Sequence, residues 1–115
     1  MSFVYAGRGF VLLWLTQPNF RIHIAASLCA IALGLLFQIS AAEWLILVTT
    51  ITIVLSIEAV NTAIEKMVDF CQPGRHPVAR DAKDLSAAAV LLASTGAFIV
   101  GVLLFGPRFV RLLGG

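Results

Sequence analysis

Long stretches without a charged residue alternate with short charged segments along this chain. Three stretches contain no Asp, Glu, Lys or Arg, namely 22–42, 44–57 and 85–107. A helix that crosses a membrane needs about 20 mostly apolar residues, and the first and third stretches are long enough by themselves. The pattern therefore predicts at least two membrane-spanning helices.

The middle stretch is shorter, but its helical pattern continues through residues 58–69, with polar side chains on one side. We interpret 44–69 as one long helix. Nearer the start, residues 5–15 mix Arg8 and glycines with bulky apolar side chains, which is typical of a helix lying in the membrane interface. The prediction is an all-α integral membrane protein forming a single membrane domain over 1–115, with an interfacial helix in 1–18 and three spans contained in helices 22–42, 44–69 and 81–107.

Composition supports this fold class and excludes others. Of the 115 residues, 60% are hydrophobic and 12% are charged, and the mean hydropathy is +0.99. Soluble domains average roughly 45–50% apolar and about 25% charged residues, and a soluble domain this short cannot bury so much apolar surface. The net charge of +2 is small and scattered, which argues against nucleic acid as a partner. The predicted surroundings are a lipid bilayer.

Basic residues flank the predicted spans unequally. The short cytoplasmic flanks of membrane proteins are enriched in Lys and Arg. The N-terminal flank and the surroundings of the 70–80 loop contain Arg8, Arg21, Lys66, Arg75, Arg80 and Lys83, whereas the opposite side contains Arg108 and Arg111. This asymmetry predicts that the N-terminus and the 70–80 loop lie in the cytoplasm.

Five polar side chains of the second predicted helix share one face: Glu58, Asn61, Thr62, Glu65 and Asp69. At about 100° per residue they form a stripe about 100° wide and about 16 Å long. A carboxylate at membrane depth is costly unless it is paired or hydrated, and three on one stripe repel one another. A cation is expected between them, and Mg²⁺, which prefers oxygen ligands, is the obvious candidate. We therefore favour a functional role for Glu58 and Glu65 over a purely structural one.

A second charged cluster opens the third predicted helix. Arg80, Lys83 and Asp84 share one face by their i, i+3 and i+4 spacing. An ammonium group near a carboxylate-bound metal is an arrangement that neutralises a transferring phosphoryl group. The alternative is that these charges only anchor a helix end. For Arg80 and Asp81 we favour that alternative, because charges at helix ends are usually solvated.

The two histidines, His23 and His76, lie near the predicted membrane boundaries. A lone histidine at such a place is more often an interfacial hydrogen-bonding group than a catalyst. His76 lies in the 73–77 loop, which is predicted to face the cytoplasm, so a contact with phosphate is a weaker hypothesis for it. Three spans also give little cover to a long polar stripe, so we expect a second copy of the chain to complete the site.

Two strings in this region resemble a known signature. Residues 58–69 read Glu-Ala-Val-Asn-Thr-Ala-Ile-Glu-Lys-Met-Val-Asp, and residues 76–88 read His-Pro-Val-Ala-Arg-Asp-Ala-Lys-Asp-Leu-Ser-Ala-Ala. They closely resemble the signature of the prokaryotic diacylglycerol kinase family, which includes the undecaprenol kinases. The resemblance covers essentially the whole chain. Residues 19–23, Asn-Phe-Arg-Ile-His, look more like the undecaprenol-kinase branch than the proteobacterial diacylglycerol-kinase branch.

The resemblance implies a bacterial, multi-pass cell-membrane enzyme that is a homotrimer, with active sites at subunit boundaries near the cytoplasmic face. It implies transfer of the γ-phosphoryl group of ATP to a lipid hydroxyl, with Mg²⁺. The acceptor would be a lipid alcohol, undecaprenol or diacylglycerol, and the sequence leaves that choice open.

The resemblance also implies roles for individual residues. Glu58 would bind the lipid hydroxyl and act as its general base, with Asn61 and Asp69 supporting catalysis. Glu65 would be a metal ligand. Where the family usually has a glutamate, this chain has Gln17, so the second protein ligand to the metal is left open. The residues implied around ATP are Lys83, Asp84, Glu65, Tyr5, Gln17, Gly74, Arg75 and His76.

Two other classes of protein compete with a lipid kinase. A small proton-coupled transporter would use an intramembrane Glu58 or Glu65 to cycle protons, but it would not need Lys83 and Asp84 beside the stripe. A structural membrane subunit would tolerate neutralisation of both glutamates.

Overall fold

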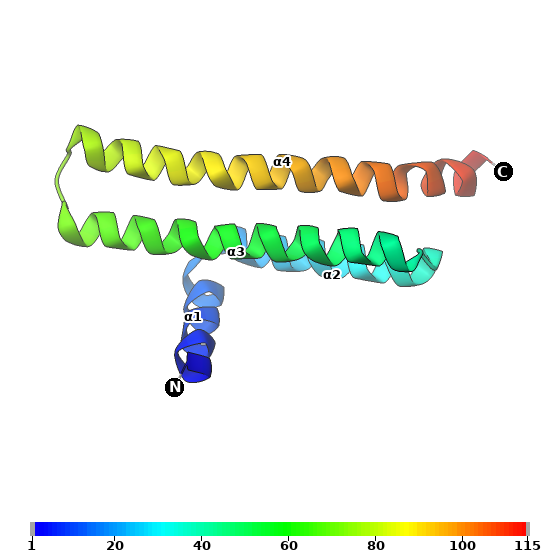
Figure 1. Cartoon of the computed structure of the whole chain (residues 1–115), viewed down its shortest axis with the longest axis horizontal. Helices are drawn as coiled ribbons and strands as arrows, with labels where there is room; N and C mark the ends of the chain where they lie inside the picture. Colours follow the sequence, from blue (N-terminus) through cyan, green and yellow to red (C-terminus); the bar gives the residue numbers. More distant parts are fainter. Residues whose placement is uncertain (1, 115) are drawn as a thin grey trace.

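A computed structural model describes residues 2–114 and contains four helices. They are α1 (Ser2–Thr16), α2 (Pro18–Phe37), α3 (Ala41–Cys71) and α4 (Pro77–Gly114) (Figure 1). The last three are 20, 31 and 38 residues long and apolar enough to cross a membrane. The predicted all-α membrane fold, with a short N-terminal helix and three long apolar ones, is confirmed.

Local sequence explains where the helices begin and end. Pro18 and Pro77 occupy the first helical positions of α2 and α4, where a missing backbone N–H is no loss. Gln38 ends α2 in the left-handed region, with φ 53°, and the chain turns there. Ser40 then caps α3 reciprocally: its hydroxyl accepts the Glu43 N–H, while the Glu43 carboxylate accepts the Ser40 N–H.

These bounds differ from the expected ones. Helix α2 begins and ends before the expected limits of 22 and 42, because Pro18 starts it and Gln38 stops it. Helix α4 includes Pro107, the expected end of the third span, and continues to Gly114.

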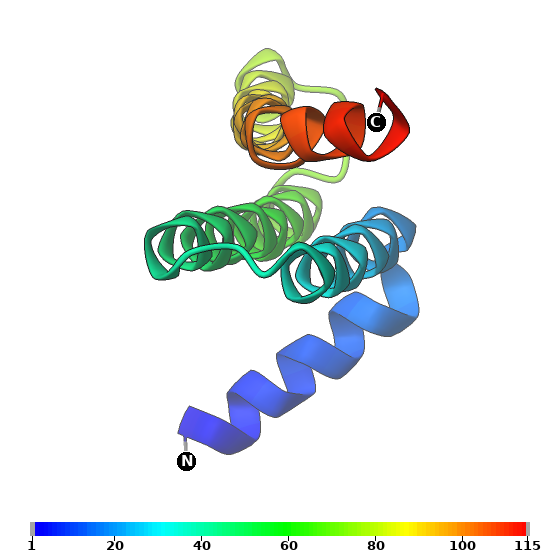
Figure 2. The ribbon, with the colours of Figure 1, turned by 90° about the vertical axis from the view of Figure 1, so that its right-hand side faces the viewer.

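The three long helices lie along one another, and α1 leaves them at a steep angle (Figure 1). Helices α3 and α4 form a long antiparallel hairpin joined by the loop at 72–76, and α2 lies beside α3. Seen end-on, α4 lies over the α2–α3 pair, and α1 lies on the opposite side against α2 (Figure 2). This arrangement places the polar face of α3 between its two neighbours.

A small core forms at the end of the bundle near the α2–α3 turn. Ile39, Leu47, Leu104 and Phe105 are buried together there. Trp44 packs closely on Gly34: a Cβ added at that glycine would lie 2.8 Å from Cη2 of the indole ring. The absence of a side chain at Gly34 therefore permits the close approach of α2 and α3.

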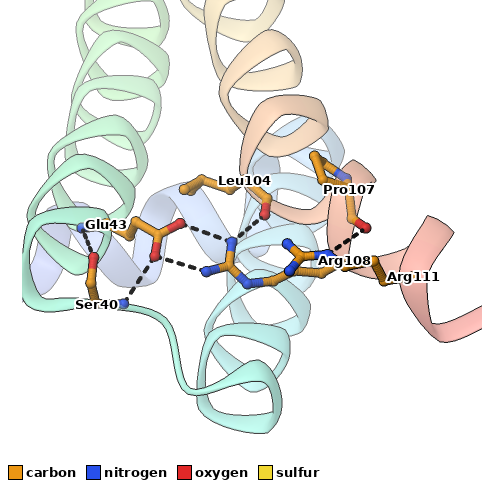
Figure 3. Close-up of polar contacts among 6 residues, drawn as sticks. All are labelled: Ser40, Glu43, Leu104, Pro107, Arg108 and Arg111. Atoms are coloured by element: carbon orange, nitrogen blue, oxygen red, sulfur yellow. Dashed lines mark hydrogen bonds and ion pairs between the residues drawn. The ribbon is translucent and has the colours of Figure 1, made fainter.

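An ion pair joins α3 to α4 at this same end (Figure 3). The Arg108 guanidinium donates to both carboxylate oxygens of Glu43, at 2.8 and 2.9 Å. Arg108 also donates to the Leu104 carbonyl at 2.7 Å. The end of the hairpin farthest from the 72–76 loop is thus fixed by a two-pronged contact, which sets the register of α3 against α4.

Candidate functional site

The polar stripe of α3 is buried at its Glu58 end and becomes exposed toward Asp69. Glu58 and Thr62 are 4% and 5% exposed, and Ser86 of α4, which faces the stripe, is 6% exposed. The Thr62 hydroxyl donates to the Glu58 backbone carbonyl. The sequence predicts a polar face at these positions, and the structure places its Glu58 and Thr62 side chains in the interior of the bundle.

Glu58 contacts a side chain from the first span. Its Oε1 lies 3.1 Å from Nε2 of His23 on α2, within ion-pair distance. The same oxygen is buried and makes no hydrogen bond among residues 2–114, so the imidazole approaches it without the alignment of a hydrogen bond. Glu58 is therefore a nearly enclosed carboxyl group with one possible cation beside it.

The contact of His23 with Glu58 is not among the sequence-based predictions, which favour an interfacial hydrogen-bonding group at this position. A signal was present: a histidine directly after the start of an apolar span, on a helix that must cover a carboxylate stripe. The sequence pattern does not identify Glu58 as the residue that His23 contacts, because the two lie far apart in the sequence.

A chain of hydrogen bonds continues from the middle of the stripe to α4. The Asn61 amide donates to Oε1 of Glu65 at 2.7 Å, and the Ser86 hydroxyl donates to Oδ1 of Asn61 at 2.7 Å. Asn61 is thereby held at both ends of its amide, and one oxygen of Glu65 remains available to a ligand. The Asn61 amide thus links the Glu65 carboxylate to Ser86 of α4.

Two ion pairs lie nearer the loop. Nζ of Lys83 lies 2.5 Å from Oδ1 of Asp69, which joins α4 to α3. Nε of Arg80 lies 3.9 Å from Oδ2 of Asp84, and both of these side chains are mostly exposed. The Lys83–Asp69 pair thus crosses the hairpin, whereas the Arg80–Asp84 pair stays within one helix face.

These charges surround an open cleft of about 840 Å³ at the loop end of the hairpin. Its walls bring together most of the residues that the family resemblance assigned to the nucleotide, namely Gly74, Arg75, His76, Lys83 and Asp84, with Asp69 beside them. His76 also caps α4, since its Nδ1 accepts the Val78 N–H at 3.2 Å, so its Nε2 is left for other contacts. The cleft combines a helix N-terminus with three basic side chains, which suits an anionic ligand.

Tyr5 and Gln17 lie apart from this cleft within a single chain. Tyr5 is exposed on α1, where it lines an open hollow with Arg8 and Leu12. Gln17 precedes α2, and its amide donates to the Thr16 hydroxyl. Neither residue lines the cleft that holds Lys83 and Asp84.

The oxygen and nitrogen ligands around the stripe determine whether the expected Mg²⁺ could bind there. Across residues 2–114, no group of three or more His, Cys, Asp or Glu side chains converges to hold a metal ion. The residues therefore do not form a complete metal cage. They do fit a cation that brings most of its ligands with it, because Mg²⁺ at nucleotide sites keeps several waters and phosphate oxygens and needs one or two carboxylates. The resemblance assigns this role to Glu65, which does not itself line the cleft at the loop.

Comparisons with known proteins decide the family. Residues 4–105 match the model of the family described as prokaryotic diacylglycerol kinase. The chain belongs to that family. It is a lipid kinase and a multi-pass bacterial membrane protein, and the alternative of a proton-coupled transporter is not favoured.

Similar proteins in the family bear two different names. An undecaprenol kinase of Bacillus subtilis (strain 168) is 40% identical over 107 residues, covering 93% of this chain and 87% of the relative. A diacylglycerol kinase of Synechocystis is 38% identical over 114 residues, covering 98% of this chain and 65% of the relative. A diacylglycerol kinase of Escherichia coli (strain K12) is 30% identical over 105 residues, covering 91% of this chain and 86% of the relative.

Proposed function

We propose that this kinase transfers the γ-phosphoryl group of ATP to the hydroxyl of a long-chain membrane alcohol, with Mg²⁺, at the cytoplasmic face of the membrane. One observation supports this most directly. The buried Glu58 carboxylate lies on the same face of α3 as Glu65 and Asp69, and that face leads to the charged cleft at the hairpin loop. One end of the stripe suits a membrane hydroxyl, and the other suits a nucleotide arriving from water.

The nucleotide is proposed to bind in the loop cleft. Lys83 offers a mobile ammonium group to phosphate oxygens, and Arg75 and the start of α4 add positive potential. Asp84 and His76 face the same space and are suited to bind the polar groups of the nucleoside. Basic residues around the loop also favour a cytoplasmic position, where ATP is available.

Glu65 is proposed to be the residue that would hold the metal accompanying ATP. Asn61 fixes the Glu65 carboxylate by its hydrogen bond, so that one oxygen can coordinate the ion. When bound, Mg²⁺ neutralises charge on the transferring phosphoryl group. Gln17 contributes at most a neutral amide oxygen, which is a weaker ligand for a hard cation than a carboxylate.

The acceptor is proposed to react beside Glu58. The oxygen of its hydroxyl forms a bond to the γ-phosphorus as the bond between that phosphorus and the ADP oxygen breaks. The hydroxyl proton passes to the Glu58 carboxylate, which acts as general base. The enclosure of Glu58 keeps bulk water from competing as the acceptor.

Undecaprenol is proposed as the preferred acceptor, ahead of diacylglycerol. The support is the segment 19–23 and the name of the relative that is 40% identical. The site is proposed to be completed in a homotrimer. Tyr5 and Gln17 lie away from the cleft of their own chain, and a partner copy offers a way to bring these residue types to it.

A phosphoryl-transfer assay tests the proposal. Purified protein in mixed micelles receives γ-labelled ATP and either undecaprenol, diacylglycerol or a lipid without a free hydroxyl. The expected result is label in the lipid fraction with both alcohols, more with undecaprenol, and none with the third lipid or after metal chelation. Absence of lipid-borne label with every alcohol would overturn the proposed reaction, and a clear advantage for diacylglycerol would reverse the preferred acceptor.

A further inference from the structure

Glu58 needs a positive neighbour if it is ionised in the resting enzyme. Its Oε1 is buried and makes no hydrogen bond among residues 2–114, and Thr62 donates to its backbone carbonyl rather than to its carboxylate. An unpaired carboxylate at such a place is strongly disfavoured. A general base must be a carboxylate to accept the hydroxyl proton, so Glu58 needs a cationic neighbour in that role.

His23 occupies the place where such a neighbour is required. Its Nε2 lies 3.1 Å from the unpartnered Oε1. Its side chain is 24% exposed, against 5% for Glu58, so a positive charge on the imidazole is less costly than an unpaired charge on the carboxyl group. The other basic residues of the site lie toward the loop: Lys83 pairs with Asp69, and Arg80 with Asp84.

We propose that His23 is the positioning residue of the general base: as an imidazolium, it is the counter-ion of the Glu58 carboxylate and holds it toward the acceptor hydroxyl. This inference rests on the proposed function, because it assumes that Glu58 is the base. The proton of the hydroxyl goes to Glu58 as the new oxygen–phosphorus bond forms, and His23 itself bonds to neither reacting atom.

A purely structural contact would behave differently. If the pair served only to join α2 to α3, loss of His23 would lower the stability of the fold while the folded enzyme kept its kcat. A counter-ion for the base must instead affect kcat, and only while Glu58 is a carboxylate. Coupling between the two residues therefore distinguishes the two roles.

Four variants carry the test: His23→Leu, His23→Gln, Glu58→Gln, and Glu58→Gln combined with His23→Leu. We expect His23→Leu to lower kcat at least about tenfold with little change in the KM for ATP, because the buried carboxylate loses its counter-ion and the contact that positions it. His23→Gln keeps an N–H donor, so it should lose less activity. In the Glu58→Gln background, His23→Leu should change kcat by less than about twofold.

A matched control is Ser27→Ala on α2. The Ser27 hydroxyl donates only to the His23 backbone carbonyl, so this change removes a hydrogen bond beside His23 without touching Glu58. It should leave kcat near its original value. Thermal unfolding in detergent confirms that each variant is folded, and His23→Gln carries the comparison if His23→Leu does not fold.

An unchanged kcat in a folded His23 variant would overturn the inference, and so would an equal loss from His23→Leu with and without Glu58→Gln. A normal kcat in Glu58→Gln alone would instead overturn Glu58 as the base. The two failures are thus distinguishable in one set of measurements.

Discussion

Lys83 of α4 and Asp69 of α3 form an ion pair across the hairpin, with 2.5 Å between Nζ and Oδ1. Both side chains are well exposed, so the pair contributes only about 0–1 kcal/mol to stability. The ion pair instead positions the ammonium group of Lys83 at the wall of the loop cleft. In the proposed site, the phosphate of ATP would take the place of Asp69 as the partner of this ammonium group, at little cost to the fold.

Replacement of Lys83 should therefore weaken ATP binding more than it weakens the fold. We expect Lys83→Met to raise the KM for ATP at least about tenfold, which corresponds to about 1.4 kcal/mol of lost interaction. Initial rates over a range of ATP concentrations measure this. The matched control is Arg80→Met, which removes another cleft cation whose pair with Asp84 is exposed. Its KM should change by less than about threefold, and equal effects of the two substitutions would contradict the role given to Lys83.

The approach of α2 to α3 depends on Gly34. A methyl group there would lie 2.8 Å from the Trp44 ring and 3.1 Å from Cδ1 of Ile39, so the indole ring or the helix that bears it must shift to admit the methyl group. Overpacking of this kind typically costs about 1–3 kcal/mol, and we expect Gly34→Ala to lower the free energy of unfolding by that amount. Denaturant titration in detergent micelles provides the measurement. Gly96→Ala, where a Cβ meets no atom within 4 Å in the single chain, is the control. A similar loss in both variants would show that the Trp44 contact is not the cause.

Sequence reasoning could predict the spans and the polar face, because both depend on local patterns. Stretches without charge mark helices that cross a membrane, and the spacing from Glu58 to Asp69 places their side chains on one face whatever the tertiary structure is. The position of residues 74–76 at the cleft could also be predicted from the sequence, because they occupy the loop that joins the helices bearing Asp69 and Lys83.

Other features depend on contacts that no local pattern encodes. The start of α2 was placed too late because Arg21 was taken as a flank, whereas its guanidinium reaches back to the Trp14 carbonyl at 2.6 Å. Helix α4 continues past Pro107, and Arg108 beyond it pairs with Glu43 of α3. The contact between His23 and Glu58 likewise follows from how α2 lies on α3, which the sequence pattern of either helix alone does not determine.

Substitutions of Gln17 and Glu65 test which residues bind the proposed Mg²⁺. A carboxylate binds Mg²⁺ better than an amide, so Gln17→Glu should lower the Mg²⁺ concentration that gives half the maximal rate. Glu65→Gln should nearly abolish the reaction, because it removes the carboxylate that Asn61 orients. Rates over a range of Mg²⁺ at saturating ATP measure both effects. If Gln17→Glu leaves the Mg²⁺ dependence unchanged, residue 17 is not a ligand.

The proposed phosphoryl-transfer mechanism depends most on Glu58 as the base that receives the hydroxyl proton. The most direct measurement is the rate of label transfer from γ-labelled ATP to undecaprenol by the folded Glu58→Gln variant, compared with the unaltered enzyme. General-base catalysis typically contributes about 10²–10⁴-fold, so we expect kcat to fall by that factor while the KM for ATP and the unfolding temperature stay close to their original values. A folded Glu58→Gln enzyme with near-normal kcat would contradict the role of Glu58 as general base.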